Sequence, residues 1–261
     1  MAEKSFAKKI RVLLTNDDGC FAESLPPAIE KLSGWAEVFV VVPDRERSAV
    51  GHSLTLNHPI RVRKLRKNFW ITDGFPSDCV KAGVFGILRF RPDLVISGIN
   101  DGANMGGDLN YSGTVSAARE GTMMGIKSLA VSALSPDEPG YEYASGVLLK
   151  AAEFLLKADL PPDIFLNINI PALPPEKING TVITSLGRKK YEEKLIKRKD
   201  PRGREYFWIG RDRELFSSEG DTDYRAVESG FISITPVCLD MTGVKYLNKL
   251  KKLNIRGRML I

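Results

Sequence analysis

The chain has 261 residues, of which 43% are hydrophobic and 27% are charged, and its formal net charge is +6 at pH 7. The length fits one large domain or one domain with a substantial appendage, and the composition is ordinary for a soluble globular protein. No window approaches 18 apolar residues, so a transmembrane helix is not expected, and the positive charge suggests an anionic ligand.

Three cysteines, Cys20, Cys79 and Cys238, lie far apart in the chain. Their odd number and wide spacing argue against a disulfide framework or a zinc cluster, and they suit a reducing compartment. The first ten residues lack the apolar core of a signal peptide. We therefore expect a cytoplasmic protein.

Residues 11–14 predict a buried strand, which breaks into the motif TNDDG at residues 15–19. The adjacent carboxylates of Asp17 and Asp18 repel each other and are costly to bury, so a hard cation is their simplest partner. The alternative is an Asx-type turn in which Asp18 caps the next helix. The motif alone favours the turn, which Gly19 permits.

Residues 23–35 have helical spacing of apolar residues, and residues 37–42 form a continuous β-branched and aromatic run. Strand, helix and strand at this distance predict a βαβ unit and a parallel sheet. The polar loop 43–51 then follows at the carboxyl end of a strand, where open α/β sheets bind ligands. Ser48 in this loop is a candidate ligand, although a turn hydroxyl is the simpler interpretation.

Residues 52–74 predict a β excursion that returns to the sheet. Its strand-like runs are residues 54–56, 60–65 and 69–72. The basic residues between Arg61 and Lys67 fit a nucleic-acid patch, but alternation with apolar residues more simply gives a solvated strand face. His52 and His58 are interpreted as structural or surface residues.

Ser77 is predicted to cap a helix over residues 78–88, and residues 94–96 form the next buried strand. A long segment rich in Gly and Asn follows, and such loops in compact domains are often functional. Asn100 comes just after its strand, as Asp17 and Asp18 do, so neighbouring parallel strands would bring these residues together.

The same segment ends in Ser112, Gly113 and Thr114, which open a predicted helix over residues 115–124. Backbone N–H groups and hydroxyls at a helix start can bind an anion. Taken alone, these three residues are better explained as an ordinary helix cap, and the long loop before them shifts the balance toward an anion site.

Further elements complete a doubly wound, mostly parallel (Rossmann-like) α/β core over residues 1–177. They are a strand at 129–134, an amphipathic helix at 143–160 that includes Phe154, and a strand at 164–170. Residues 178–261 predict a projecting β-hairpin arm, a returning strand at 231–235 and a C-terminal helix at 244–253 with an apolar tail at 259–261. We expect the arm and tail to make subunit contacts within one globular unit.

Four segments in this order and spacing resemble the SurE (survival protein E) family of metal-dependent nucleotidases. They are TNDDG at 15–19, PDRERS at 43–48, SGINDGAN at 97–104 and YSGTV at 111–115. The resemblance runs from Arg11 to about Asp240. One departure is Ala49, because glycine is common in the family directly after the serine.

The resemblance implies a 5′/3′-nucleotidase that hydrolyses nucleoside monophosphates, with short polyphosphates as further substrates of some members. It also implies one divalent cation per subunit, Mg²⁺ or Mn²⁺, and a homo-oligomer, either a dimer or a tetramer. The metal ligands carried over from the family are Asp17, Asp18, Ser48 and Asn100. The phosphate-binding residues are Asn104, Ser112, Gly113 and Thr114, and the predicted catalytic residues are Asp17 and Asn104.

Two other functions fit parts of the sequence less well. A phosphatase that forms an aspartyl-phosphate on Asp17 usually has a second Asp two residues on, where this chain has Gly19. A basic nucleic-acid-binding module would use residues 61–67 and 188–204, and its binding would depend steeply on salt. Neither membrane nor nucleic-acid partners are expected.

Overall fold

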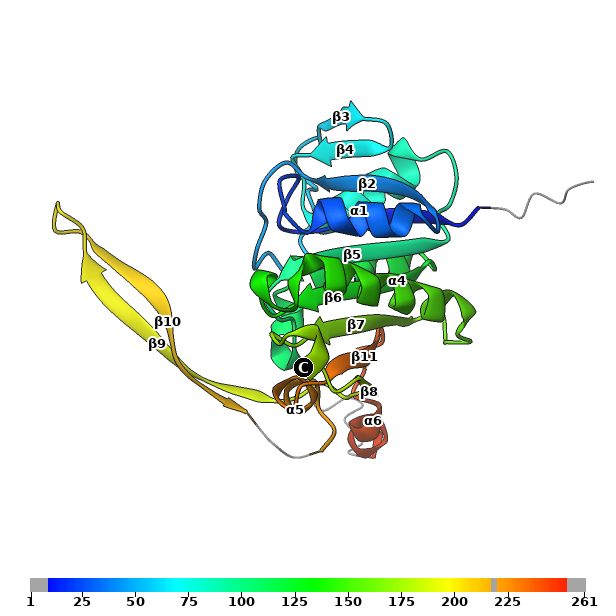
Figure 1. The fold of residues 1–261 in the computed structure, drawn as a ribbon. Helices are drawn as coiled ribbons and strands as arrows, with labels where there is room; N and C mark the ends of the chain where they lie inside the picture. Colours follow the sequence, from blue (N-terminus) through cyan, green and yellow to red (C-terminus); the bar gives the residue numbers. More distant parts are fainter. Residues whose placement is uncertain (1–8, 217–219, 253–261) are drawn as a thin grey trace, which may run out of the picture.

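A nine-stranded sheet forms the centre of the molecule in the computed structural model, which describes residues 9–216 and 220–252 (Figure 1). The strand order is β3-β4-β2-β1-β5-β6-β7-β11-β8. These strands are β1 (Arg11–Thr15), β2 (Glu37–Pro43), β3 (Val62–Arg66), β4 (Phe69–Thr72), β5 (Leu94–Asp101), β6 (Lys127–Ala133), β7 (Ile164–Ile170), β8 (Thr181–Ile183) and β11 (Ile232–Cys238). The pairs β3–β4 and β7–β11 are antiparallel and the other pairs are parallel, which confirms the predicted sheet.

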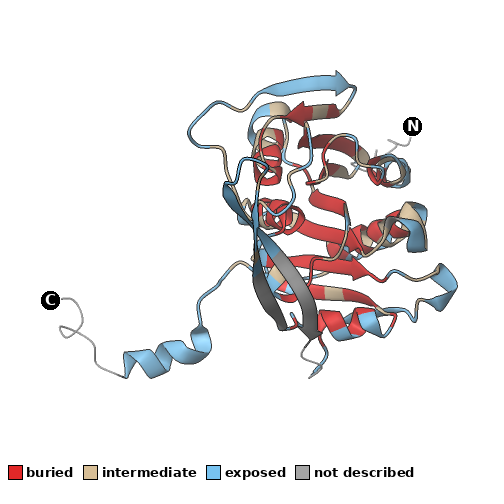
Figure 2. Ribbon diagram, turned by 90° about the vertical axis from the view of Figure 1, so that its left-hand side faces the viewer, coloured by how far each residue is buried: buried red, intermediate tan, exposed pale blue. Residues whose placement is uncertain are grey.

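Helices cover both faces of this sheet, and the strands between them are largely buried (Figure 2). The helices are α1 (Leu25–Ser33), α2 (Pro76–Lys81), α3 (Gly113–Met123), α4 (Tyr141–Lys157), α5 (Asp223–Glu228) and α6 (Val244–Lys251). Helices α1 and α4 contact each other, as do α2 and α3. None of the helices within the described ranges is long and apolar enough to cross a lipid bilayer.

Strand β1 shows why the sheet is doubly wound. Val12 and Leu14 belong to the core cluster that contains residues of α1 and α4, whereas Leu13 packs with residues of α2 and α3. Because successive side chains of a strand point to opposite faces, a strand that is apolar throughout needs a helix layer on each side. The predicted α/β fold class is therefore confirmed.

The carboxyl ends of β1, β2 and β5 meet at one edge of the sheet. Thr15 of β1 is in register with Ser97 of β5. The loop after β2 bends over the end of β1, where the Arg47 N–H donates a 2.7 Å hydrogen bond to the Asp17 carbonyl oxygen. Segments that are far apart in the sequence thus converge where a doubly wound sheet binds ligands.

The predicted strand at 54–56 is wrong. The Thr55 hydroxyl donates to Asp78 Oδ2 at 2.6 Å, and the Thr55 N–H donates to the same carboxylate. Leu56 is 83% exposed. A side chain rather than a neighbouring strand satisfies this backbone, so the alternation of apolar residues did not produce a strand.

Two helix predictions also need correction. Helix α2 begins at Pro76 instead of after a Ser77 cap, since Pro fits the first turn and Asp78 Oδ2 accepts from the Phe75 N–H at 2.9 Å. It continues as a wider helical turn over Ala82–Ile87. In α4, Phe154 is 51% exposed and lies outside the buried stripe in which we expected it.

The C-terminal part returns to the main sheet, where β11 pairs with β7 and β8 pairs with β11. Between β8 and β11, the strands β9 (Lys189–Lys199) and β10 (Glu205–Phe216) form a two-stranded antiparallel arm that projects from the body (Figure 1). The side chains of residues 189–194 and 210–216 lie outside the description.

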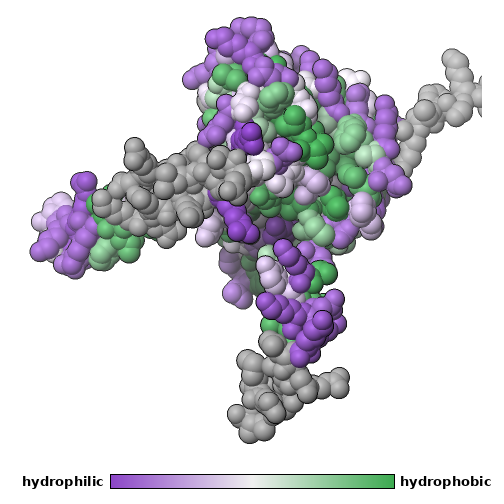
Figure 3. All heavy atoms as spheres, turned by 90° about the horizontal axis from the view of Figure 1, so that it is seen from below, coloured by the Kyte–Doolittle hydropathy of each residue, from purple (hydrophilic) through white to green (hydrophobic). Residues whose placement is uncertain are grey.

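The arm and α6 carry exposed apolar side chains. Ile209 and Leu195 on the arm are 76% and 67% exposed, and a hydrophobic band lies behind the hydrophilic tip of the arm (Figure 3). All eight residues of α6 are exposed, and Figure 2 shows this helix standing away from the body. The predicted end of this helix at Leu253 and the apolar tail at 259–261 lie outside the described residues.

Candidate active site

The turn after β1 is closed by Asn16. Its Nδ2 donates to the Gly19 carbonyl oxygen at 3.0 Å, and its Oδ1 accepts from the Gly19 N–H at 3.2 Å. Gly19 has a φ of +88°, and a Cβ at this position would lie 2.6 Å from the carbonyl carbon of Arg45. The turn therefore packs directly on the loop that carries Ser48, and only glycine fits there.

Asp17 is 4% exposed and contacts the start of α3. The Thr114 hydroxyl donates to Asp17 Oδ1 and lies 3.2 Å from Asn100 Oδ1, so it connects the ends of β1 and β5. Burial raises the pKa of Asp17, and the hydrogen bonds from Thr114 and the Gly113 backbone offset only part of that increase. An ionised Asp17 thus lacks full compensation from the protein alone.

Gly113 leaves the space that the Asp17 side chain occupies. A Cβ on Gly113 would lie 2.9 Å from both Cβ and Oδ2 of Asp17, and 3.1 Å from Cγ of Pro76. Ser112 is the N-cap of α3, with its Oγ accepting from the Val115 N–H at 3.0 Å. The plain capping interpretation of Ser112 is therefore confirmed, whereas phosphate binding by these residues stays a prediction.

Asp18 is the second carboxylate of the pair. Burial, followed by the charges of Asp17 and Asp101, raises the pKa of Asp18 to about 7. Its Oδ2 is buried and has no hydrogen-bond partner among the described residues. Asp18 does not cap α1, whose N-cap is Ser24.

A cavity of about 190 Å³ opens beside Asp17. Five predicted site residues line it: Asp17, Ser48, Asn100, Asn104 and Ser112. Asp18 is not among the lining residues, and Gly113 and Thr114 contact Asp17 instead of lining the cavity. Sequence reasoning missed five other lining residues, namely Ala49, Asp101, Ala103, Asp108 and Tyr111. Most of these belong to the Gly- and Asn-rich segment, and the unusual composition of that segment was the signal by which they could have been found.

The loop after β2 brings Ser48 to the cavity. Ser48 Oγ donates to Glu46 Oε1 at 2.7 Å, which leaves its lone pairs available to a cation. The next residue, Ala49, has a φ of +54°. The resemblance implies glycine at this position, and the positive φ is a conformation that glycine adopts more readily than alanine.

Asn100 lies within the end of β5 rather than beyond it, because the strand extends to Asp101. Its Nδ2 donates to the Gly102 carbonyl oxygen at 2.8 Å, and its Oδ1 lies beside the Thr114 hydroxyl. An amide oxygen is thereby held next to Asp17. The predicted convergence of Asn100 with the Asp17–Asp18 turn is present in the structure.

Asn104 is held by the neighbouring strands. Its N–H donates to Asn169 Oδ1 at 2.8 Å, and its carbonyl oxygen accepts from Nδ2 of both Asn167 and Asn169. Its own Nδ2 donates to Ser132 Oγ at 2.8 Å. These supporting residues were not predicted, although two asparagines two positions apart in an apolar strand were a visible signal.

His52 has a structural partner instead of a place in the cavity lining. Its Nε2 lies 2.8 Å from Glu120 Oε2, and Lys81 Nζ lies 2.6 Å from Glu120 Oε1. Burial acts to raise the pKa of Glu120, but hydrogen bonds from His52 and Lys81 outweigh it, so this pKa is lower than its ordinary value of 4.5. The three residues connect the loop after β2 to α2 and α3.

Replacing Glu120 by Gln should lower the free energy of unfolding by about 1–3 kcal/mol at pH 7, because two partners lose a charged acceptor in a buried position. The folded-state pKa of Glu120 is depressed, so its stabilisation is fully present above about pH 4.5 and is lost as the pH falls through the folded-state pKa. Urea unfolding of both proteins between pH 7 and pH 3.5 measures this difference. A stability gap that stays constant across this range would contradict the charged pairing.

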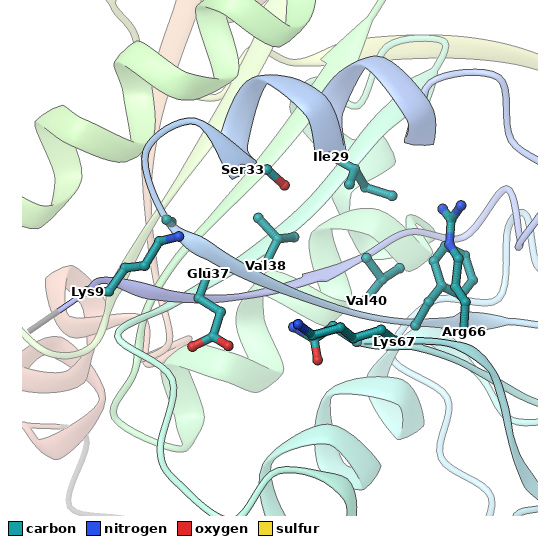
Figure 4. A pocket seen from close by; sticks show the side chains of 11 residues that line it. Lys9, Ile29, Ser33, Glu37, Val38, Val40, Arg66 and Lys67 are labelled. Carbon is teal, nitrogen blue, oxygen red and sulfur yellow. The ribbon is translucent and has the colours of Figure 1, made fainter.

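A larger hollow lies at the opposite end of the strands. It has a volume of about 550 Å³ and is lined by Lys9, Ile29, Glu37 and Lys67 among others, near the amino ends of β1 and β2 (Figure 4). Glu37 is the only carboxylate among its described lining residues, so it offers no acidic pair. The paired carboxylates single out the smaller cavity.

Within the described ranges, no three His, Cys, Asp or Glu side chains gather in a way that could hold a metal. The candidate metal site therefore depends on two carboxylates with neutral oxygens beside them. Those oxygens come from Ser48 and Asn100, which are ligand types suited to a hard cation.

Known proteins resemble this chain over most of its length. The family model described as survival protein SurE matches residues 12–193. A protein of Geotalea uraniireducens named 5'-nucleotidase SurE is 47% identical over 93% of this chain and 98% of its own length. One of Geobacter metallireducens with the same name is 48% identical over 93% of this chain and 96% of its own length.

The fold also matches a solved structure. The crystal structure of the SurE protein from Aquifex aeolicus superposes with a TM-score of 0.83 at 42% sequence identity, and the match covers 93% of this chain and 99% of that one. Matches of this coverage and identity extend over both the sheet and the loops that form the cavity. The chain therefore belongs to the survival protein SurE family.

Proposed function

We propose that this protein is a metal-dependent nucleotidase that hydrolyses nucleoside 5′- and 3′-monophosphates to nucleoside and phosphate. The observation that carries the proposal is the pair formed by the buried Asp17 and the half-buried Asp18, with Asp17 lining a small polar cavity at the carboxyl edge of the sheet. The name 5'-nucleotidase SurE, which its relatives carry over nearly their whole length, supports it. Short polyphosphates are further candidate substrates.

The residues present fit a divalent cation. Asp18 Oδ2 is buried without a hydrogen-bond partner among the described residues, and burial raises the pKa of both carboxyl groups. The described residues that line the cavity include three carboxylates and no basic side chain. Asp17, Asp18, Ser48 and Asn100 would hold one Mg²⁺ or Mn²⁺ per subunit, which when bound polarises a phosphoryl oxygen and lowers the pKa of bound water.

The remaining residues orient the phosphate. A phosphate monoester is dianionic, so its hydrolysis depends on placement and charge stabilisation more than on covalent help. Asn104 and Ser112 line the cavity and would donate neutral hydrogen bonds to phosphoryl oxygens, with Gly113 and Thr114 completing the helix start. Asp17 would accept or return a proton at its carboxylate, and Asn104 would stabilise the developing charge.

Two alternatives receive less support. Gly19 stands where an aspartyl-phosphate mechanism usually has its second carboxylate. A nucleic-acid-binding module would combine the basic residues of β3 with those of the arm, but β3 lies at one end of the sheet and the arm projects beyond the other (Figure 1). The two stretches therefore do not form one basic surface.

We also propose a homo-oligomer, either a dimer or a tetramer, in which the arm and α6 contact other subunits. The exposed apolar residues of both elements support this, because exposed apolar patches of this kind mark interaction sites. A cytoplasmic location is supported by the three free cysteines.

The test of the proposed function is phosphate release from a panel of nucleoside 5′- and 3′-monophosphates with Mg²⁺, Mn²⁺ or no added metal. We expect turnover of nucleotides such as AMP or GMP in the presence of metal and its loss with a chelator. Binding to RNA that depends steeply on salt, without phosphate release, would favour the nucleic-acid-binding alternative.

A further inference from the structure

Asp223, at the start of α5, joins three backbone segments through one carboxylate. It is 0% exposed. Its Oδ2 accepts from the Gly106 N–H at 2.7 Å, and its Oδ1 accepts from the N–H groups of Gly187 at 2.8 Å and Tyr224 at 2.9 Å. Gly106 and Gly187 are 117 and 36 residues away in the chain, so these are long-range connections.

The backbone around this carboxylate is closely packed. The Tyr224 hydroxyl donates to the Met105 carbonyl oxygen at 2.9 Å. Gly106 has a φ of +52°, and a Cβ there would lie 2.6 Å from both the Gly187 carbonyl oxygen and Cε2 of Tyr224. A Cβ on Gly187 would lie 2.5 Å from Cδ2 of Tyr224.

The two distant segments that Asp223 joins belong to different parts of the molecule, the cavity and the arm. Met105 and Gly106 directly follow Asn104, which lines the cavity. Gly187 lies two residues before β9, at the root of the arm. Asp223 does not line the cavity itself, so any influence on the reaction passes through the backbone it holds.

We infer that Asp223 is a positioning residue that fixes Asn104 in the phosphate cradle by tying the Met105–Gly106 backbone to the root of the arm. The inference rests on the proposed function, because Asn104 matters as a phosphate contact only if the cavity binds phosphate. Asn104 has its own anchors on β6 and β7, and Asp223 holds the chain that follows it. Displacement of such a group by about 1 Å can cost roughly 100-fold in rate.

An Asp223→Asn variant tests the inference. Its amide has one acceptor oxygen in place of two, so an N–H group would face the N–H of Gly106 or Gly187. We expect kcat for AMP, expressed per folded molecule, to fall at least about tenfold, and the Kd of inorganic phosphate to rise at least about fivefold. Partial unfolding alone would change neither quantity once the folded fraction is taken into account.

Asp93→Asn is the matched control. Asp93 Oδ2 accepts from the Arg11 N–H at 2.8 Å at the amino end of β1, away from the cavity. We expect this variant to keep kcat and the Kd of phosphate within about twofold of the unmodified protein. Tyr224→Phe is a second test that keeps the shape of the ring, and we expect it to lower kcat about threefold by loosening Met105.

Hydrogen exchange gives a readout that does not depend on turnover. We expect the peptides around Gly106 and Gly187 to exchange faster together in Asp223→Asn, and to be unchanged in Asp93→Asn. The inference is overturned if Asp223→Asn folds with kcat, phosphate affinity and exchange within twofold of the unmodified protein. If the unmodified protein hydrolyses no nucleotide, the proposed function fails instead, and phosphate affinity together with exchange still decides whether Asp223 positions the cradle.

Discussion

Replacing Asp17 by Asn should abolish turnover, with phosphate release from AMP falling at least about 1,000-fold under saturating Mg²⁺. Asn has nearly the same shape, so the contacts with Thr114 and Gly113 can persist while the negative charge is lost. Because burial raises the pKa of Asp17, ionised Asp17 is a cost to the folded state without a cation. We therefore expect stability in the absence of metal to be unchanged or higher.

The measurement combines steady-state phosphate release with thermal unfolding of the metal-free protein. Asp93→Asn serves as its control, since Asp93 lies at the other end of the strand pair β1–β5 and should keep full activity. Activity near that of the unmodified protein in Asp17→Asn would show that the carboxylate is not part of the reacting site. A joint loss of activity and stability would indicate a structural role instead.

Replacing Gly113 by Ala should lower kcat/KM for AMP about 100-fold, because the new methyl group would meet Asp17 at 2.9 Å and push its carboxylate away from Asn100. Alanine is a better helix former than glycine at this helix start, so local propensity does not oppose the change. Overpacking should lower the free energy of unfolding by only about 1–3 kcal/mol. Kinetics and urea unfolding of the same sample separate the two effects.

Gly107→Ala is the matched control for this prediction. Gly107 lies in the same Gly-rich segment, and a Cβ there would have no heavy atom within 4 Å. We expect its activity and stability to stay within about twofold and about 0.5 kcal/mol of the unmodified protein. If Gly113→Ala keeps more than half of the activity, the close contact between the α3 start and Asp17 has no part in catalysis.

The parts of the fold that could be predicted are those in which local pattern and burial agree. After Glu37, the run over β2 is apolar and forms a strand covered on both faces. The stretch at 54–56 alternates apolar and polar residues, which also predicts a strand, yet the Asp78 carboxylate accepts from its backbone N–H and Leu56 remains exposed. Periodicity reports which side chains are apolar, and it does not report which group will satisfy the backbone.

In the candidate site, too, local pattern predicts some positions, and distant partners decide others. Asp17, Asn100 and Ser48 could be predicted to converge because each is close to the carboxyl end of a strand in one parallel sheet. The role of Asp223 could not be predicted, because its partners Gly106 and Gly187 are distant in the chain and are held through backbone N–H groups of no particular residue type. Asn167 and Asn169 are an intermediate case. Their spacing in β7 is visible in the sequence, but the sequence does not show that both donate to the Asn104 carbonyl oxygen.

The central claim is that the Asp17–Asp18 pair holds one divalent cation on which phosphomonoester hydrolysis depends. The most direct measurement is a titration of metal-stripped protein with Mn²⁺, in which bound Mn²⁺ and phosphate release from AMP are followed in the same samples. We expect both to rise together and to saturate at about one Mn²⁺ per chain. Full phosphate release from the stripped protein in the presence of a chelator would contradict the claim.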